Sequence, residues 1–293
     1  KFDLINIQEV SIMKIGVVDV GGGLRGIYAA GIFDYCLDND INFDTCIGVS
    51  AGSANVASYV AKQRGRNYKF YAEYSFRRSY MSLTNFIFKR SYIDLEYIYG
   101  KMSNTGGEYP IDYENLMSNP AEMIVVGTRA RTGKPMYFDK SDMSKDHYEI
   151  FMASSAIPYV CKPHAVHGLY YFDGALGDPV PIKKAFEHGC DKVVVILTKP
   201  ISACEDVSEQ DMKLAKKIEK KFPQAAASLR TKARRYKEGV EYALKCQEEG
   251  TALVVYPDDT CGVDTVKRNK ENFDRFYKKG YEDAKIIKDF VKQ

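Results

Sequence analysis

Short apolar runs alternate along the chain with stretches whose apolar side chains recur at helical spacing. The runs at 14–20 and 44–49 predict buried strands, and residues 26–39 between them predict a helix. Further strands are expected at residues 122–128, 136–138, 169–172, 192–198 and 252–256. Strands that alternate with helices predict an α/β fold of three layers, in which helices cover both faces of a mostly parallel central sheet.

Two segments depart from this alternation. Residues 67–99 contain eleven aromatic residues and five lysines or arginines, without a clear period. Residues 205–249 have a helical pattern that is interrupted at Pro223, and their part from 213 to 237 contains ten basic residues and one acidic residue.

The length of 293 residues and the 45% of hydrophobic residues are sufficient for one large domain with its own core. Three parts are expected within it. Residues 1–13 are expected to be a leader or a segment added for expression, with Met13 as the natural start. Residues 14–200 are expected to form the α/β core. Residues 201–293 are expected to form a helix-rich extension packed on the same domain. The net charge of +3 and the absence of nucleic-acid motifs disfavour a nucleic-acid partner.

Seven cysteines, an odd number, include no C-x-x-C pair and no His or Cys at zinc spacing. This pattern favours reduced thiols and a cytoplasmic protein, and predicts neither a metal site nor a disulfide framework. The first thirteen residues lack the apolar run of a signal peptide.

A glycine-rich sequence, GGGLRG at residues 21–26, lies between the first predicted strand and the first helix. It matches the G-x-G-x-x-G pattern of dinucleotide-binding loops, which also requires an acidic residue at the end of the second strand. Asp44 stands at the beginning of that strand, and Ser50 follows its end. Backbone N–H groups of such a loop can instead surround an oxyanion, and Gly22 and Gly23 are the candidate donors.

Ser50 lies in GVSAG, which matches the G-x-S-x-G nucleophile elbow between a strand and a helix. The elbow comprises Gly48, Val49, Ser50, Ala51 and Gly52. The two glycines are needed because side chains there would collide with the backbone of the sharp turn. Since consecutive parallel strands end at the same edge of a sheet, the glycine loop and Ser50 are expected to converge, and the N–H of Ala51 can join the donors.

Ser50 needs a base, and the chain has four histidines. The order Ser50, Asp173, His188 fits an α/β-hydrolase, although only one predicted strand precedes this elbow. His188 is better explained as the last residue of a helix closed by Gly189. Asp173 is the stronger candidate, because it ends a strand and is followed by the small residues Gly174 and Ala175.

A second aspartate, Asp178, is close in sequence to Asp173. It precedes Pro179 and a helix expected to begin near Val180, which predicts that it caps this helix.

The motifs GGGLRG, GVSAG and DGA, in this order, resemble those of the patatin-like phospholipases of the bacterial, cytosolic type. The resemblance extends through TGKPMYF, ASSAIP and DPVP and covers about residues 14–200. It implies a patatin-like fold that differs from the standard α/β-hydrolase arrangement, a Ser50 nucleophile, Asp173 as proton acceptor, and no cofactor or metal. It also implies an oxyanion hole formed by Gly21, Gly22, Gly23, Leu24, Arg25 and Gly26.

The resemblance further implies fatty-acyl ester substrates, such as phospholipids or lysophospholipids. Residues 67–99 then form a lid or acyl channel, with Arg77, Arg78, Lys89 and Arg90 near phosphate groups, or else they pack as core and rim. Residues 213–237 make peripheral contact with a membrane or form a solvated helical face.

Two other interpretations of the whole chain stay open at this point. One is an α/β-hydrolase-type esterase that uses His188 as its base. The other is a catalytically silent membrane-binding or nucleotide-binding protein that retains the loop.

Overall fold

The computed structural model describes residues 13–292. The expected leader therefore lies outside the described residues, apart from Met13. The strands are β1 Ile15–Asp19, β2 Thr45–Val49, β3 Glu122–Arg129, β4 Pro135–Phe138, β5 His164–Val166, β6 Leu169–Asp173, β7 Lys192–Ile196 and β8 Ala252–Val255. The helices are α1 Ile27–Asp38, α2 Ala51–Val60, α3 Arg66–Ala72, α4 Leu83–Lys89, α5 Tyr113–Ser118, α6 Glu149–Ser154, α7 Ile182–Glu187, α8 Glu209–Ile218, α9 Pro223–Arg230, α10 Lys232–Glu248, α11 Lys270–Asp283 and α12 Ile287–Phe290.

All eight strands form one sheet. Its centre consists of the parallel strands β3, β2, β1, β7 and β8 in that order. β6 pairs antiparallel with β3 and with β5, and β4 also pairs antiparallel with β3. The predicted mostly parallel sheet is thus confirmed.

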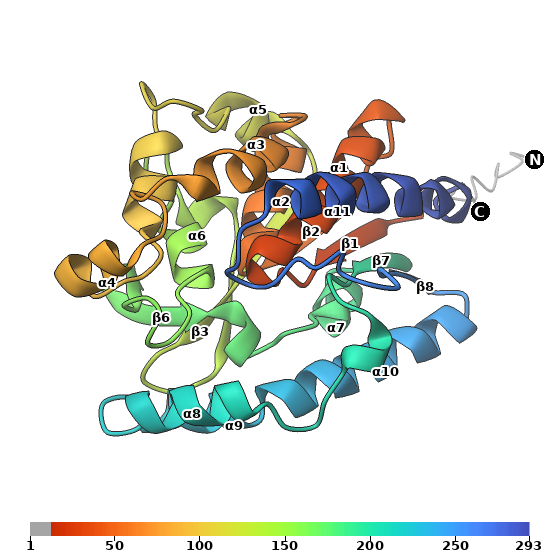
Figure 1. The fold of residues 1–293 in the computed structure, drawn as a ribbon. Coiled ribbons are helices and arrows are strands. Elements are labelled where there is room, and N and C mark those ends of the chain that lie inside the picture. The colour runs from red at the N-terminus through yellow and green to blue at the C-terminus, as the bar shows by residue number, and fades with distance from the viewer. Residues whose placement is uncertain (1–12, 293) are drawn as a thin grey trace, which may run out of the picture.

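Helices cover both faces of this sheet because successive strand residues point to opposite sides. In β1, Val17 belongs to the core formed with α1, α2 and α11, whereas Val18 belongs to the core formed with α7 and α10. Figure 1 shows α1, α2 and α11 on one side of the strands and α7 and α10 on the other. The three-layer α/β/α architecture expected from the sequence is therefore correct.

Strands β2 and β6 meet end to end on one edge of β3. Val49 at the end of β2 pairs with Val126, and Asp173 at the end of β6 pairs with the next residue, Gly127. β4 occupies the opposite edge of β3 at these same two positions. The residue after Val49 is Ser50, so this register brings Ser50 and Asp173 together.

The two irregular segments resolve into short elements. Residues 205–249 contain three helices, and Pro223, at which a break was predicted, is the first residue of α9, where a missing N–H has no effect. Residues 67–99 contain most of α3, all of α4 and the start of a π-helix, Glu96–Met102. These helices of about two turns are too short for a periodic pattern to identify them.

Candidate active site

Ser50 occupies the sharp turn between β2 and α2. Its backbone has φ 56° and ψ −128°, a conformation that an L-residue adopts only when the surrounding structure enforces it. A Cβ on Gly48 would lie 2.4 Å from Ser53 Cα, and one on Gly52 would lie 2.5 Å from the Asp19 carbonyl oxygen. Both glycines are thus required by close backbone contacts on either side of the serine.

Ser50 and Asp173 form a buried hydrogen-bonded pair. Ser50 Oγ donates to Asp173 Oδ2 at 2.6 Å, and the Ala175 N–H donates to Asp173 Oδ1 at 2.9 Å. The two side chains are 7% and 4% exposed. Burial raises the pKa of Asp173, and the hydrogen bonds from Ser50 and Ala175 partly oppose this shift. Gly174 lets this turn pack on β3, because a Cβ there would lie 2.1 Å from the Val126 carbonyl oxygen.

Ser154, at the end of α6, fixes the backbone of the elbow. Its Oγ accepts the Ser50 N–H at 2.9 Å and donates to the Val126 carbonyl at 2.6 Å. Sequence reasoning included this residue in ASSAIP but assigned it no role. Because the Ser50 N–H is thus occupied, it is not a free donor for a ligand.

The loop after β1 adopts backbone angles that only glycine tolerates well. Residues 21–23 all have positive φ, from 62° to 127°. The Gly21 N–H donates to Asp19 Oδ1 at 2.8 Å, and the Leu24 N–H donates to the Thr265 carbonyl at 3.0 Å. Within residues 13–292, the N–H groups of Gly22 and Gly23 have no protein acceptor.

This loop lies against the elbow. A Cβ on Gly21 would be 2.1 Å from the Val49 carbonyl oxygen and 3.2 Å from the Ala51 nitrogen. Gly22 and Gly23 line a wide cavity that is also lined by Ser50 and Asp173. The structure therefore brings together the loop, the elbow and the aspartate.

Two residues of the loop have mainly structural contacts. Arg25 Nη1 donates to Thr265 Oγ1 at 2.8 Å, while its buried Nε has no acceptor among the residues the structure describes. Gly26 is restricted by Tyr71, whose hydroxyl would be 2.4 Å from a Cβ at that position. Of the six loop residues predicted for an oxyanion hole, Gly22 and Gly23 are those that line the wide cavity and whose backbone N–H groups have no acceptor among the described residues.

Sequence reasoning missed Asp19, the fully buried last residue of β1. Its Oδ1 accepts the Gly21 N–H, and its Oδ2 accepts Asn55 Nδ2 at 2.8 Å. Burial raises its pKa to about 6, although both hydrogen bonds act in the opposite direction. The signal was present in the sequence, since a charged residue within an apolar strand needs a buried partner.

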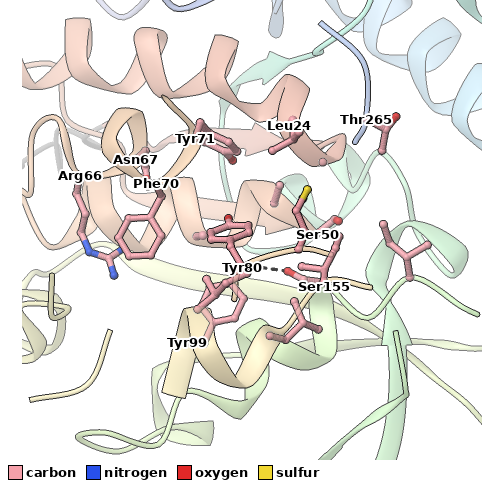
Figure 2. Close-up of a pocket in the computed structure, with 18 residues that line it drawn as sticks. Leu24, Ser50, Arg66, Asn67, Phe70, Tyr71, Tyr80, Tyr99, Ser155 and Thr265 are labelled. Carbon is pink, nitrogen blue, oxygen red and sulfur yellow. Dashed lines mark hydrogen bonds between the residues drawn. The ribbon is translucent and has the colours of Figure 1, made fainter. Parts of the chain in front are cut away.

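Two cavities meet at Ser50. The narrow one, of about 70 Å³, has a mainly apolar lining that includes Phe70, Tyr80 and Ile98. Figure 2 shows that it extends from Ser50 past Tyr80 toward Phe70 and Arg66. The wide one, of about 440 Å³, contains charged and polar groups of the chain after residue 198. These include Lys199, Glu205, Asp211, Lys232, Tyr236 and Asp264.

The expected arginine and lysine cluster of residues 67–99 does not line either cavity. Arg77 pairs with Glu108, and Lys89 pairs with Asp94. Arg78 and Arg90 are exposed. Four of the eleven aromatic residues of this segment do line the narrow cavity; they are Phe70, Tyr71, Tyr80 and Tyr99.

His188 lies at the opposite end of the sheet from Ser50. Its Nδ1 is 3.3 Å from Glu122, the first residue of β3, and Lys14 Nζ donates to its carbonyl at 2.9 Å. It is the C-cap of α7 and is followed by Gly189 at φ 82°, as predicted. This position contradicts the interpretation in which His188 is the base, because Ser50 follows the far end of a neighbouring strand.

The prediction that Asp178 caps a helix is wrong. α7 begins at Ile182, and its N-cap residue is Pro181, without a side-chain cap. Asp178 instead accepts a hydrogen bond from Tyr137 OH at 2.7 Å. The run of two prolines around Val180 delays the start of the helix.

The site contains a serine on a strained elbow, at the carboxyl end of a strand of an α/β/α sheet. This serine is hydrogen-bonded to a carboxylate. The arrangement defines the class of protein. In a comparison with family models, that of the patatin-like phospholipases matches residues 20–186, more than half of the chain. The chain belongs to the patatin-like phospholipase family. A second model, a domain of unknown function (DUF6363), matches residues 222–291.

Among curated proteins, the uncharacterized protein YjjU of Escherichia coli (strain K12) is 29% identical over 192 residues. The match covers 64% of this chain and 52% of YjjU, so it spans about half the length of that relative. Among solved structures, VipD from Legionella pneumophila matches with 14% identity and a TM-score of 0.46, covering 96% of this chain and 67% of VipD.

No helix within residues 13–292 is long and apolar enough to cross a bilayer. All seven cysteines, which lie in the same range, are free thiols.

Proposed function

We propose that this protein is a serine lipid acyl hydrolase, similar in activity to phospholipase A or lysophospholipase, which cleaves fatty-acyl esters through an acyl-Ser50 intermediate. The observation that carries the proposal is the 2.6 Å hydrogen bond from Ser50 Oγ to Asp173 Oδ2, at the junction of the narrow, mainly apolar cavity and the wide cavity, which charged side chains also line. Family membership supports the coarser statement of a lipid hydrolase.

In the first half-reaction Ser50 Oγ attacks the ester carbonyl carbon, and its proton passes to Asp173 Oδ2. The tetrahedral intermediate collapses when the bond to the leaving alcohol breaks, and Asp173 returns the proton to that alcohol. In the second half-reaction a water molecule gives a proton to Asp173 and attacks the acyl-Ser50 carbonyl carbon. When this second tetrahedral intermediate collapses, the bond to Ser50 Oγ breaks, Asp173 returns the proton to that oxygen, and the fatty acid is released.

Aspartate is an intrinsically weaker base than histidine, by about 2.6 pKa units or about 3.5 kcal/mol. Burial of Asp173 raises its pKa and so reduces this difference. Ser50 Oγ contacts Asp173 Oδ2 directly, and the Ala175 N–H already orients the carboxylate through Oδ1. No third side chain is therefore needed to hold the base.

The negative oxygen of the tetrahedral intermediate needs donors that are already in place. The N–H groups of Gly22 and Gly23, free of protein acceptors within residues 13–292, are the proposed oxyanion hole, with that of Ala51 as a third donor. Each such donor stabilises the transition state by about 2.7 to 4 kcal/mol. Serine chemistry with backbone donors requires no metal or cofactor.

The acyl chain is proposed to occupy the narrow cavity, and the alcohol portion the wide cavity with its charged side chains. An apolar chain gains about 0.8 kcal/mol per buried methylene, so the narrow cavity favours fatty-acyl groups over acetyl groups. Its far end is closed by Arg66, whose guanidinium donates to Ser58 Oγ at 3.1 Å and Ser103 Oγ at 2.8 Å.

A fluorophosphonate probe tests the nucleophile, because it modifies activated serines. We expect labelling of the wild-type protein at Ser50, none in Ser50→Ala, and unchanged labelling in His188→Ala. A folded wild-type protein that is not labelled would instead support a catalytically silent binding protein. Mass spectrometry of a bacterial lipid extract, incubated with wild type or Asp173→Asn, then identifies the ester that is consumed.

A further inference from the structure

The most exposed large apolar side chains of the described residues are all on α4. Leu83 is 73% exposed, Ile87 70% and Phe88 81%. Leu83 and Ile87 are four residues apart and share one side of the helix, and Phe88 follows about 100° further round from Ile87. Figure 1 shows α4 at the periphery of the molecule. Apolar side chains gathered in this way mark an interaction surface.

The chain that carries α4 leaves and rejoins the body at the narrow cavity. Met81 and Ile93 form an antiparallel bridge, and both line that cavity. The Ser82 N–H donates to the Tyr92 carbonyl at 3.0 Å beside this bridge. The exposed helix is thus the tip of a loop whose base forms part of the proposed acyl channel.

A basic helix lies next to this tip. The ring of Phe86 on α4 is 5.7 Å from that of Tyr159, and Lys217 Nζ of α8 is 3.9 Å from the centre of the Tyr159 ring. Pro158 and Val160, on either side of this tyrosine, line the wide cavity. Tyr159 therefore joins α4 to α8 at the rim of the site.

Exposed lysines of α8 and the residues just after it have no acidic partner within 4.0 Å among residues 13–292; they are Lys216, Lys217, Lys220 and Lys221. The acidic residues of this segment have other partners: Glu209 pairs with Lys213, Asp211 with Lys232, and Glu219 with Arg230. We use the term α4–α8 surface for these lysines together with Leu83, Ile87 and Phe88.

We propose that the α4–α8 surface docks on an anionic lipid bilayer. The apolar side chains of α4 enter the region of the acyl chains, while the lysines of α8 contact anionic head groups, the combination by which peripheral proteins bind membranes. A bilayer fits better than a protein partner because the apolar tip projects from the body and the long lysine side chains have no acidic partner among residues 13–292. The surface also adjoins both cavities that reach Ser50.

Co-sedimentation with vesicles tests the proposal in the Ser50→Ala protein, which excludes turnover from the measurement. We expect stronger binding to equimolar phosphatidylcholine and phosphatidylglycerol than to phosphatidylcholine alone, with a decrease at high salt. The triple variant L83S/I87S/F88S should lower the partition coefficient roughly tenfold or more with both vesicles. The variant K216Q/K217Q/K220Q/K221Q should abolish the preference for phosphatidylglycerol.

Controls replace equal numbers of exposed apolar residues or lysines outside the α4–α8 surface. They are L169S/Y170S/I286S for the apolar variant and K134Q/K145Q/K267Q/K278Q for the lysine variant. Exposed substitutions of this kind alter stability little, which thermal unfolding verifies. Vesicle binding by L83S/I87S/F88S equal to that of its control would overturn the proposal.

Docking and hydrolysis are separable outcomes. If Ser50→Ala binds vesicles through this surface but the wild type hydrolyses no ester, the docking proposal stands and the proposed function fails. If sedimentation velocity shows that L83S/I87S/F88S dissociates a dimer without a change in vesicle binding, the surface is a contact between two copies and the docking proposal fails.

Discussion

Asn55 holds Asp19 and the glycine loop together, with one Nδ2 atom 2.8 Å from Asp19 Oδ2 and 3.0 Å from the Gly26 carbonyl oxygen. Its Oδ1 accepts a hydrogen bond from Tyr71 OH at 3.1 Å. The position of the loop therefore depends on one buried amide of α2.

Replacement of Asn55 by alanine should destabilise the protein and reduce catalysis. It leaves a buried carboxylate oxygen without its donor, which costs about 1 to 3 kcal/mol. Urea unfolding measures this loss, and hydrolysis of a soluble ester measures the fall in kcat. The exposed Asn42→Ala is the control, and a stability of Asn55→Ala equal to that of this control would contradict the role of Asn55.

The stability of the wild type relative to Asp19→Asn should depend on pH. The pKa of Asp19 is raised from 3.8 to about 6, so its contribution is fully present below pH 4 and is lost as the pH rises through about 6. The difference between these pKa values corresponds to about 3 kcal/mol. Unfolding of both proteins between pH 4 and 7 should show the wild type losing this advantage, whereas a constant difference would refute a titrating Asp19.

Asp173→Asn should retain the fold and lose about 10² to 10⁴-fold in kcat, because an amide cannot accept the Ser50 proton. In the wild type, kcat/KM should fall as the pH falls through the raised pKa of Asp173, with a midpoint above its ordinary value of 3.8. His188→Ala should show the same pH profile. A profile that moves in His188→Ala would point to the imidazole as the base.

Gly22→Ala should reduce kcat about 10² to 10³-fold, as the loss of an oxyanion donor does. Gly22 has φ 127°, and a Cβ there would lie 2.5 Å from Thr198 Oγ1. The control is Gly189→Ala, which has φ 82° with open space around it, so its cost of about 1 to 2 kcal/mol falls on stability alone. Equal kcat values for the two variants would argue against the loop as an oxyanion hole.

Ala54→Phe should change the preferred acyl length, because Ala54 lines the narrow cavity. We expect roughly a tenfold or greater loss of kcat/KM for long acyl esters, since several methylenes at about 0.8 kcal/mol each lose their site. Butyryl esters should be little affected. Ala227→Phe, at an exposed position, is the control, and an unchanged chain-length profile would place the acyl chain elsewhere.

The sequence predicted every strand of the described residues except the short β5, as well as the layers and the adjacency of Ser50 to the glycine loop, because each rests on local patterns. Apolar runs identify buried strands, and a strand-turn-helix with small residues identifies an elbow. The choice of Asp173 over His188 rested on the order of three motifs and on the helical context of His188. The division at residue 200 stays a prediction.

Contacts that join distant segments could not be predicted from one sequence. The end-to-end meeting of β2 and β6 on β3 depends on register, which local composition does not determine for short strands. The anchoring of the elbow by Ser154 and of the loop by Asp19 likewise depends on tertiary placement. Helices of about two turns, such as α4, carry too few residues to reveal a period.

The Leu24 N–H donates a hydrogen bond to the Thr265 carbonyl, so the last quarter of the chain helps to position the glycine loop beside Ser50. A protein truncated after its three recognisable motifs would keep Ser50 and Asp173 but lose the hydrogen bond to the Thr265 carbonyl that holds the glycine loop. Deletion mapping of this family should therefore be interpreted with care, since an inactive short fragment can reflect a displaced backbone rather than a missing chemical group.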